Sequence, residues 1–247
     1  MTIRSIAAIA VILFGGLVAS GQKVIKDTIK SQGKDRGYYL FVPDNLDAAK
    51  PAPMIVMLHG SGHNGLSLVE KWTQLAKKEG IILLGPDASD PAMWNVPSDA
   101  PDPLHELVEA IKKKYPVDPR RVYLFGHSAG AVVSYYVALM ESEYFAAAAI
   151  HAGAMRPTDT AIIAQAKRKI PIAVWVGTND ALFPLKDVRA TVDMLKTHGI
   201  DATLTEMKGR THNYYEHSDE VNDMVWTFLK DKSLSAEPKY EQYLWKK

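Results

Sequence analysis

Apolar runs alternate with helical periodicity along most of the chain. Runs typical of buried strands occupy residues 37–42, 53–58, 81–84, 121–125, 145–150, 172–176 and 202–207. Apolar spacings of three and four predict helices over residues 66–79, 104–115, 129–140, 161–169, 185–198 and 219–230. Strands that alternate with helices in this way form parallel sheets with helices packed on both faces. The pattern therefore predicts an α/β fold with a mostly parallel central sheet.

Two long segments lack this alternation. Residues 87–102 are polar and rich in proline around a single Trp94, which predicts a long loop. Loops of this length in compact domains usually have a functional role. Residues 232–247 mix charged and aromatic side chains and form a predicted C-terminal tail, which either packs on the body or frays.

The N-terminus has the pattern of a secretory signal peptide. Arg4 precedes residues 5–21, which carry no charge, are rich in Ile, Ala, Val and Leu, and end in the small residues Ser20 and Gly21. We predict a signal peptide over residues 1–21, export to the periplasm or the outside of the cell, and an α/β domain over residues 22–231. The alternative is a retained anchor helix, but a membrane span needs about 20 apolar residues. No stable membrane anchoring is therefore expected after cleavage.

Composition narrows the possible chemistry. In 247 residues, 29 Lys and Arg balance 28 Asp and Glu, and the net charge is +1. A net charge this small gives no overall electrostatic attraction for a nucleic acid, so no nucleic-acid partner is expected. The chain has no cysteine, which excludes disulfides, zinc–thiolate sites and cysteine nucleophiles. Any covalent catalysis must then use Ser, Thr, Lys or a carboxylate.

A G-x-S-x-G motif occupies residues 126–130, between a predicted strand and a predicted helix. This is the context of a nucleophile elbow, whose tight turn requires glycine two residues before and after the serine. Ser128 would then lie at a helix N-terminus, where the dipole and free N–H groups favour a developing oxyanion. Ser128 is our candidate nucleophile, and the alternative is a strand-to-helix turn that merely needs glycine.

A second loop offers a place for an oxyanion hole. The sequence HGSG at residues 59–62 follows the predicted strand over residues 53–58 and precedes the next predicted helix. Enzymes with a nucleophile elbow take one oxyanion donor from this loop and one from the residue after the serine. We expect the two donors to be the N–H of Ala129 and a backbone N–H in the segment from Gly60 to Ser61. His59 is expected to orient the loop.

In enzymes with a nucleophile elbow, the catalytic acid follows the serine along the chain, and the histidine follows the acid. Asp180 directly follows the predicted strand over residues 172–176, so it lies at the carboxyl edge of the sheet, where Ser128 also emerges. Asp187, Asp193 and Asp201 fall within or beyond the next helix and are interpreted as surface charges.

Three histidines follow Asp180 in the sequence. His198 ends a predicted helix, where a cation suits the helix dipole. His212 lies in the loop after the last predicted strand and is our candidate base, with His217 as the second choice. A serine, histidine and aspartate triad needs no metal and no organic cofactor.

Three segments together resemble the α/β-hydrolase superfamily: the HGSG loop, VDPRRVYLFGHSAGA at residues 117–131 and GTNDALFP at residues 177–184. More narrowly, they resemble secreted esterases that include polyhydroxybutyrate depolymerases and feruloyl or acetyl-xylan esterases. The resemblance implies the α/β-hydrolase fold and a triad of Ser128, Asp180 and His212. It also implies that Ser61 and Ala129 are the oxyanion donors.

Four residues on loops at the predicted active edge are candidate substrate contacts: His63, Trp94, Tyr214 and Tyr215. No insertion is long enough to form a large cap, so we expect an open cleft for a small or polymeric ester. The predicted function is a secreted serine esterase acting on feruloyl, acetyl-sugar, hydroxyalkanoate or short-chain esters. A serine peptidase or amidase on the same fold and a non-catalytic binding protein remain alternatives.

Overall fold

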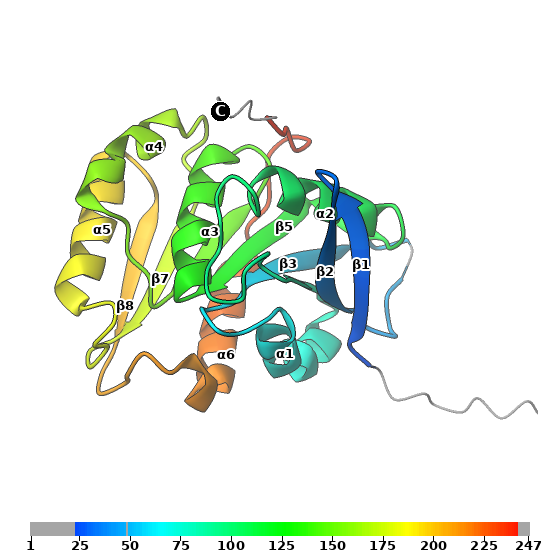
Figure 1. Ribbon diagram of the computed structural model, residues 1–247, viewed down its shortest axis with the longest axis horizontal. Helices are drawn as coiled ribbons and strands as arrows, with labels where there is room; N and C mark the ends of the chain where they lie inside the picture. Colours follow the sequence, from blue (N-terminus) through cyan, green and yellow to red (C-terminus); the bar gives the residue numbers. More distant parts are fainter. Residues whose placement is uncertain (1–22, 48, 242–247) are drawn as a thin grey trace, which may run out of the picture.

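The computed structural model describes residues 23–47 and 49–241, so the predicted signal peptide lies outside the described residues. The described chain forms an eight-stranded sheet with the order β1-β2-β4-β3-β5-β6-β7-β8 (Figure 1). The strands are β1 (Ile25–Ser31), β2 (Lys34–Phe41), β3 (Ala52–Leu58), β4 (Ile82–Pro86), β5 (Val117–His127), β6 (Ala147–His151), β7 (Ile172–Gly177) and β8 (Ala202–Met207). The α-helices are α1 (Leu66–Glu79), α2 (Asp102–Lys112), α3 (Ala129–Met140), α4 (Thr160–Gln165), α5 (Leu185–Thr197) and α6 (Ser218–Leu229).

Strands β3 to β8 are parallel to one another, whereas β1 pairs with β2, and β2 with β4, in antiparallel register. The mostly parallel α/β fold is thus confirmed. The carboxyl ends of parallel strands meet at one edge of a sheet, where open α/β folds bind their ligands. The loops after β3, β5, β7 and β8 therefore reach the same edge.

Helices cover both faces of the sheet and bury two separate apolar clusters. Along β3, Met54, Val56 and Leu58 belong to the cluster that also contains side chains of α2, α3, α4 and α5, while Ile55 and Met57 belong to the cluster that contains side chains of α1 and α6. Figure 1 shows α1 and α6 side by side beneath the sheet. Because side chains alternate between two buried faces, every position of β3 is apolar, and this explains its continuous apolar run. None of the helices in residues 23–47 and 49–241 is long and apolar enough to span a membrane.

Several elements begin or end a few residues away from the predicted bounds, as β5 does at both ends, and two differences have a clear physical reason. Strand β1 was not predicted, because it is an edge strand whose first four residues, Ile25 to Thr28, are all exposed. Helix α4 ends at Gln165 and not at residue 169, since Ala166 is extended. The guanidinium of Arg168 instead donates to the carbonyls of Ser142 and Phe145, both at 2.6 Å, which draws the chain out of the helix.

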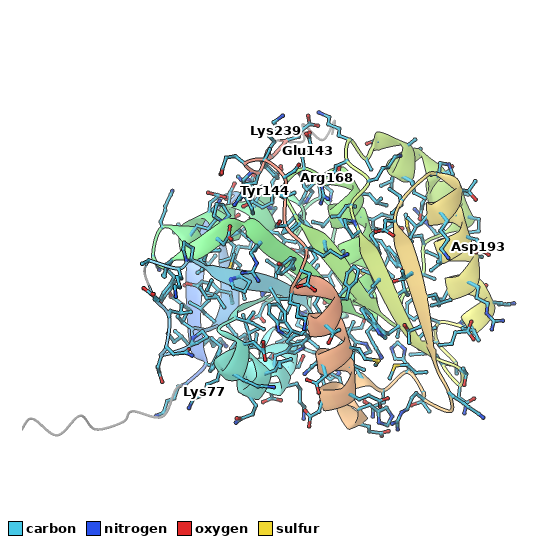
Figure 2. The ribbon with its side chains drawn as sticks, turned by 180° about the vertical axis from the view of Figure 1, so that it is seen from behind. Lys77, Glu143, Tyr144, Arg168, Asp193 and Lys239 are labelled. Atoms are coloured by element: carbon cyan, nitrogen blue, oxygen red, sulfur yellow. The ribbon has the colours of Figure 1, made fainter. Side chains whose placement is uncertain are left out.

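The described part of the C-terminal tail packs on the body. Leu234 is buried, and its N–H donates to the Arg120 carbonyl at 3.0 Å. The ring of Tyr240 stacks on His105 with centroids 3.6 Å apart. Figure 2 shows Lys239 near Glu143, with the charged groups 3.8 Å apart. Residues 232–241 of the tail therefore pack on the body and do not fray.

Candidate active site

Ser128 occupies a strained turn between β5 and α3. Its φ of 57° and ψ of −119° lie in a region that L-residues rarely adopt. A Cβ atom at position 126 would overlap the Gly130 carbonyl, and one at position 130 would overlap the Leu58 carbonyl. Glycine at both positions is thus required on steric grounds, and the turn presents the Ser128 side chain at the carboxyl edge of the sheet.

His212 lies between the serine and the acid. Its Nε2 is 2.9 Å from Ser128 Oγ, and its Nδ1 is 2.9 Å from Asp180 Oδ2. The Asp180 side chain is fully buried, and its Oδ1 accepts hydrogen bonds from the N–H groups of Leu182 and Phe183 at 2.9 and 2.8 Å. One carboxylate oxygen is therefore held by the backbone, and the other faces the imidazole.

The loops that carry Asp180 and His212 are joined by their backbones. The N–H of Asn179 donates to the Arg210 carbonyl at 2.9 Å, and that of Thr178 donates to the Met207 carbonyl at 3.0 Å. A side chain at Gly177 would overlap the Arg210 carbonyl, so glycine at the end of β7 permits this close approach. This contact fixes the distance between the acid and the histidine.

The other two histidines downstream of Asp180 have different partners. The Nδ1 of His198 is 2.8 Å from the Met194 carbonyl in the last turns of α5. The Nε2 of His217 is 3.9 Å from a carboxylate oxygen of Glu216. The structure thus brings His212, and neither of these two, to Ser128 and Asp180.

The HGSG loop lies directly against the nucleophile. A Cβ on Gly60 would be 3.2 Å from Ser128 Cβ, and Ser61 lines the same cavity as Ser128 and Ala129. The N–H of Ala129 is the first of α3, where the leading N–H groups have no partner within the helix. The two expected oxyanion donors therefore flank Ser128.

His59 holds this loop in place. The Ala88 N–H donates to its Nε2 at 3.2 Å, so the proton is on Nδ1, which donates to the Gly60 carbonyl at 2.9 Å. The indole of Trp94 donates to the His59 carbonyl at 2.8 Å. Burial lowers the pKa of His59, and the neutral ring fits this arrangement of one donor and one acceptor.

A buried pair of histidines lies behind the site. His127 and His151 are partners in the register of β5 and β6, and their Nδ1 atoms are 3.0 Å apart. The ring of His127 lies 5.0 Å from that of His212. Burial lowers the pKa of His151 to about 3 and that of His127 well below 6.5, so both rings are neutral at pH 7.

We expect acid to destabilise the fold through this pair. In the unfolded chain a histidine titrates near pH 6.5, whereas His151 in the folded chain titrates near pH 3. Between these values the unfolded chain binds a proton that the folded chain does not, so stability is full above pH 6.5 and falls as the pH is lowered. Well below pH 6.5, where the unfolded chain is fully protonated at these positions, each of the two histidines should cost about 1.4 kcal/mol per pH unit.

Urea unfolding at pH 7, 6 and 5 measures this effect. Replacing His151 with Asn removes one of the two groups, so the dependence of the unfolding free energy on pH should be shallower, by a difference that grows to about 1.4 kcal/mol per unit at the acid end of this range. An unfolding free energy that stays constant between pH 7 and pH 5 in the unmodified protein would contradict the prediction.

Two cavities open beside Ser128. The first, of about 770 Å³, is lined mainly by apolar side chains that include Trp94, Val132 and Ile162. The second, of about 560 Å³, is lined by His63 and Tyr215, whose ring centroids are 4.8 Å apart, among polar side chains. The candidate contacts Trp94, His63 and Tyr215 thus lie at the cavities.

Tyr214 does not reach either cavity. It is fully buried, its hydroxyl donates to Asn222 Oδ1 at 2.6 Å, and its ring packs 5.7 Å from Phe125. The short 3₁₀ helix Tyr214–Glu216 points its first side chain into the core and its second toward the site. The expectation that Tyr214 contacts substrate is therefore wrong.

The loop over residues 87–101 forms one wall of the apolar cavity and is tied down by Asp99. This buried carboxylate accepts hydrogen bonds from Arg36 Nη1 at 2.7 Å, Ser89 Oγ at 3.1 Å and the Asn95 N–H at 2.8 Å. The loop has no regular structure, but its position is fixed from within. Sequence reasoning missed Arg36 and Asp99, since 63 residues separate them.

No group of three or more His, Asp or Glu side chains is placed to hold a metal ion in the part of the chain that the structure describes. The absence of a metal or organic cofactor from the reaction stays a prediction, which rests on the chemistry of the triad.

The strained serine turn and the eight-stranded sheet define this protein as an α/β hydrolase. The sequence model of the Dienelactone hydrolase family matches residues 7–244, and the chain belongs to that family. A bifunctional acetylxylan esterase/xylanase from Neocallimastix patriciarum is 28% identical over 170 residues, which cover 67% of this chain and 24% of that protein. Feruloyl esterase B from Neurospora crassa is 32% identical over 163 residues, or 61% of this chain and 54% of that protein.

This chain therefore spans between about a quarter and about half of these relatives. The crystal structure of a thermostable esterase has a TM-score of 0.67 at 24% identity, covering 85% of this chain and 63% of that one, and supports the fold. The resemblance to α/β hydrolases and to acetyl-xylan and feruloyl esterases is confirmed, whereas that to polyhydroxybutyrate depolymerases stays a prediction.

Proposed function

We propose that this protein is a carboxylic ester hydrolase that uses Ser128 as nucleophile, His212 as base and Asp180 as the acid that orients His212. The observation that carries the proposal is the position of His212, 2.9 Å from Ser128 Oγ on one side and 2.9 Å from Asp180 Oδ2 on the other. Two predicted backbone donors, on Ser61 and Ala129, would complete the oxyanion hole.

In the proposed mechanism, His212 Nε2 takes the Ser128 proton while Oγ attacks the ester carbonyl. Asp180 accepts the hydrogen bond from Nδ1 and stabilises the imidazolium, and the oxyanion is held by the two N–H groups. His212 then gives the proton to the departing alcohol. Water activated by the same histidine hydrolyses the acyl-enzyme.

The relatives suggest candidate substrates. Their names describe acetylxylan and feruloyl esterases, so acetyl and feruloyl esters of sugars are the first substrates to test. Hydroxyalkanoate and short-chain esters are further candidates. We also propose export to the periplasm or the outside of the cell, which is supported by the uncharged stretch over residues 5–21.

A substrate panel tests the proposal. Purified protein is incubated with p-nitrophenyl esters, feruloyl and acetyl sugar esters, a hydroxybutyrate ester and aminoacyl p-nitroanilides, and a fluorophosphonate probe is mapped by peptide mass spectrometry. We expect ester turnover and a label on Ser128. Faster turnover of the anilides would indicate a peptidase or amidase instead, and absence of both turnover and label would indicate a binding protein.

A further inference from the structure

The two cavities beside Ser128 differ in their access to His212. Ser61 and Ser128 line both, but His212 lines only the second, together with Asn179 and Thr211. In the proposed mechanism the departing alcohol must receive its proton from His212 Nε2, so it has to lie on the side of the histidine. The acyl group then occupies the other, apolar cavity.

The apolar cavity extends along one face of α3. Val132, Tyr136 and Met140 line it at intervals of four residues from Ser128, and residues four apart share a helix face. The helix rises about 1.5 Å per residue, so this face is about 18 Å long. A chain of ten carbon–carbon bonds of about 1.5 Å each is shorter than this distance.

The opposite walls of this cavity are also apolar. Trp94, Ile162 and Phe183 face it from the loop after β4, from α4 and from the loop after β7. Met93 and Val96 also line it, and both are exposed. An acetyl group would leave most of the 770 Å³ unfilled.

Two of the polar side chains of this cavity, Arg156 and Tyr136, are bonded to the same carboxylate. The charged one is Arg156, whose guanidinium is exposed and bonded to Asp159 at 3.0 Å. The hydroxyl of Tyr136 donates to the same carboxylate at 2.6 Å. Because Arg156 and Tyr136 are already paired and most of the other lining side chains are apolar, the cavity offers an acyl group mainly apolar contacts.

We propose that the site prefers esters of an extended apolar acid, with a chain of about eight to ten carbons lying along α3, over acetyl esters. This inference rests on the proposed ester hydrolase function and adds a substrate class to it. The second cavity, with amide and hydroxyl side chains around the histidine, suits a hydroxylated alcohol.

A series of p-nitrophenyl esters with two to twelve acyl carbons tests the preference, because the alcohol stays constant. Each buried methylene contributes about a fourfold gain in binding. We expect kcat/KM to rise by about 100-fold or more from acetate to octanoate, and then to level off or fall. A profile that is flat or highest for acetate would overturn the inference, although the ester hydrolase function would stand. Failure to hydrolyse any ester would instead overturn the proposed function.

Met140→Trp tests the location, because the larger side chain would fill the far end of the cavity. The ratio of kcat/KM for decanoate to that for butyrate should fall by about tenfold. Met194→Trp is the matched control, since Met194 is also a half-buried helical methionine but lies on α5 beside a different cavity. Its ratio should equal that of the unmodified protein.

A second variant guards against misfolding of the first. Ile162→Trp narrows the cavity from α4, and thermal melting of both variants shows whether they fold. Folded Met140→Trp and Ile162→Trp proteins with the same chain-length profile as Met194→Trp would overturn the proposed location.

Discussion

Replacing Ser128 with Ala is expected to lower kcat for ester hydrolysis by about 10⁴- to 10⁶-fold. The substitution removes Ser128 Oγ, which lies 2.9 Å from His212 Nε2, and the members of such a triad act as a unit. Rates at saturating p-nitrophenyl ester, compared with those of the unmodified protein, measure the effect. Residual turnover would come from the oxyanion hole and from substrate binding.

The fold should survive this change. The Ser128 hydroxyl makes no capping bond to α3, and the backbone N–H that bonds the His151 carbonyl at 3.1 Å is retained. We therefore expect an unaltered circular dichroism spectrum and a melting temperature within a few degrees of the unmodified protein. Ser235→Ala changes an exposed serine of the tail and is the control for the expression and purification of a Ser→Ala variant. Ester turnover in folded Ser128→Ala protein at the rate of that control would rule out Ser128 as nucleophile.

The sequence was sufficient where a site residue is defined by its immediate neighbours. Gly126 and Gly130 indicate the turn around Ser128 because each glycine relieves a specific overlap with a carbonyl. The strand preceding Asp180 and the order of the motifs were enough to select it and His212. These features depend on few residues, and the sheet edge brings them together.

What the sequence did not predict depends on contacts between distant segments. His127 and His151 become partners only because β5 and β6 are neighbours in the sheet order. Strand β1 pairs with β2 through its backbone while most of its side chains remain exposed, so it has no apolar pattern to detect. Which of Tyr214 and Tyr215 faces the cavity beside Ser128 depends on the direction of one short helical turn.

Asp180→Asn is expected to lower kcat by about 10⁴-fold, and the reason lies in the orientation of the carboxylate. Asp180 Oδ1 accepts two backbone N–H groups, from Leu182 and Phe183. In the variant only the amide oxygen can accept them, so the NH₂ group must face His212 Nδ1. The imidazole then has to accept at Nδ1 and carry its proton on Nε2, which can no longer take the proton of Ser128.

The variant keeps the size and the backbone contacts of Asp180, so the loss should appear in kcat, while KM changes little. Asp187→Asn is the matched control, because Asp187 is exposed at the start of α5, seven residues farther along the same segment. It should retain the kcat of the unmodified protein. If Asp180→Asn lost less than about tenfold in kcat, the role of Asp180 in fixing the His212 tautomer would be wrong. A large loss confined to Asp180→Asn would mean that the hydrogen bond to Nδ1 sets the protonation on which the attack by Ser128 depends.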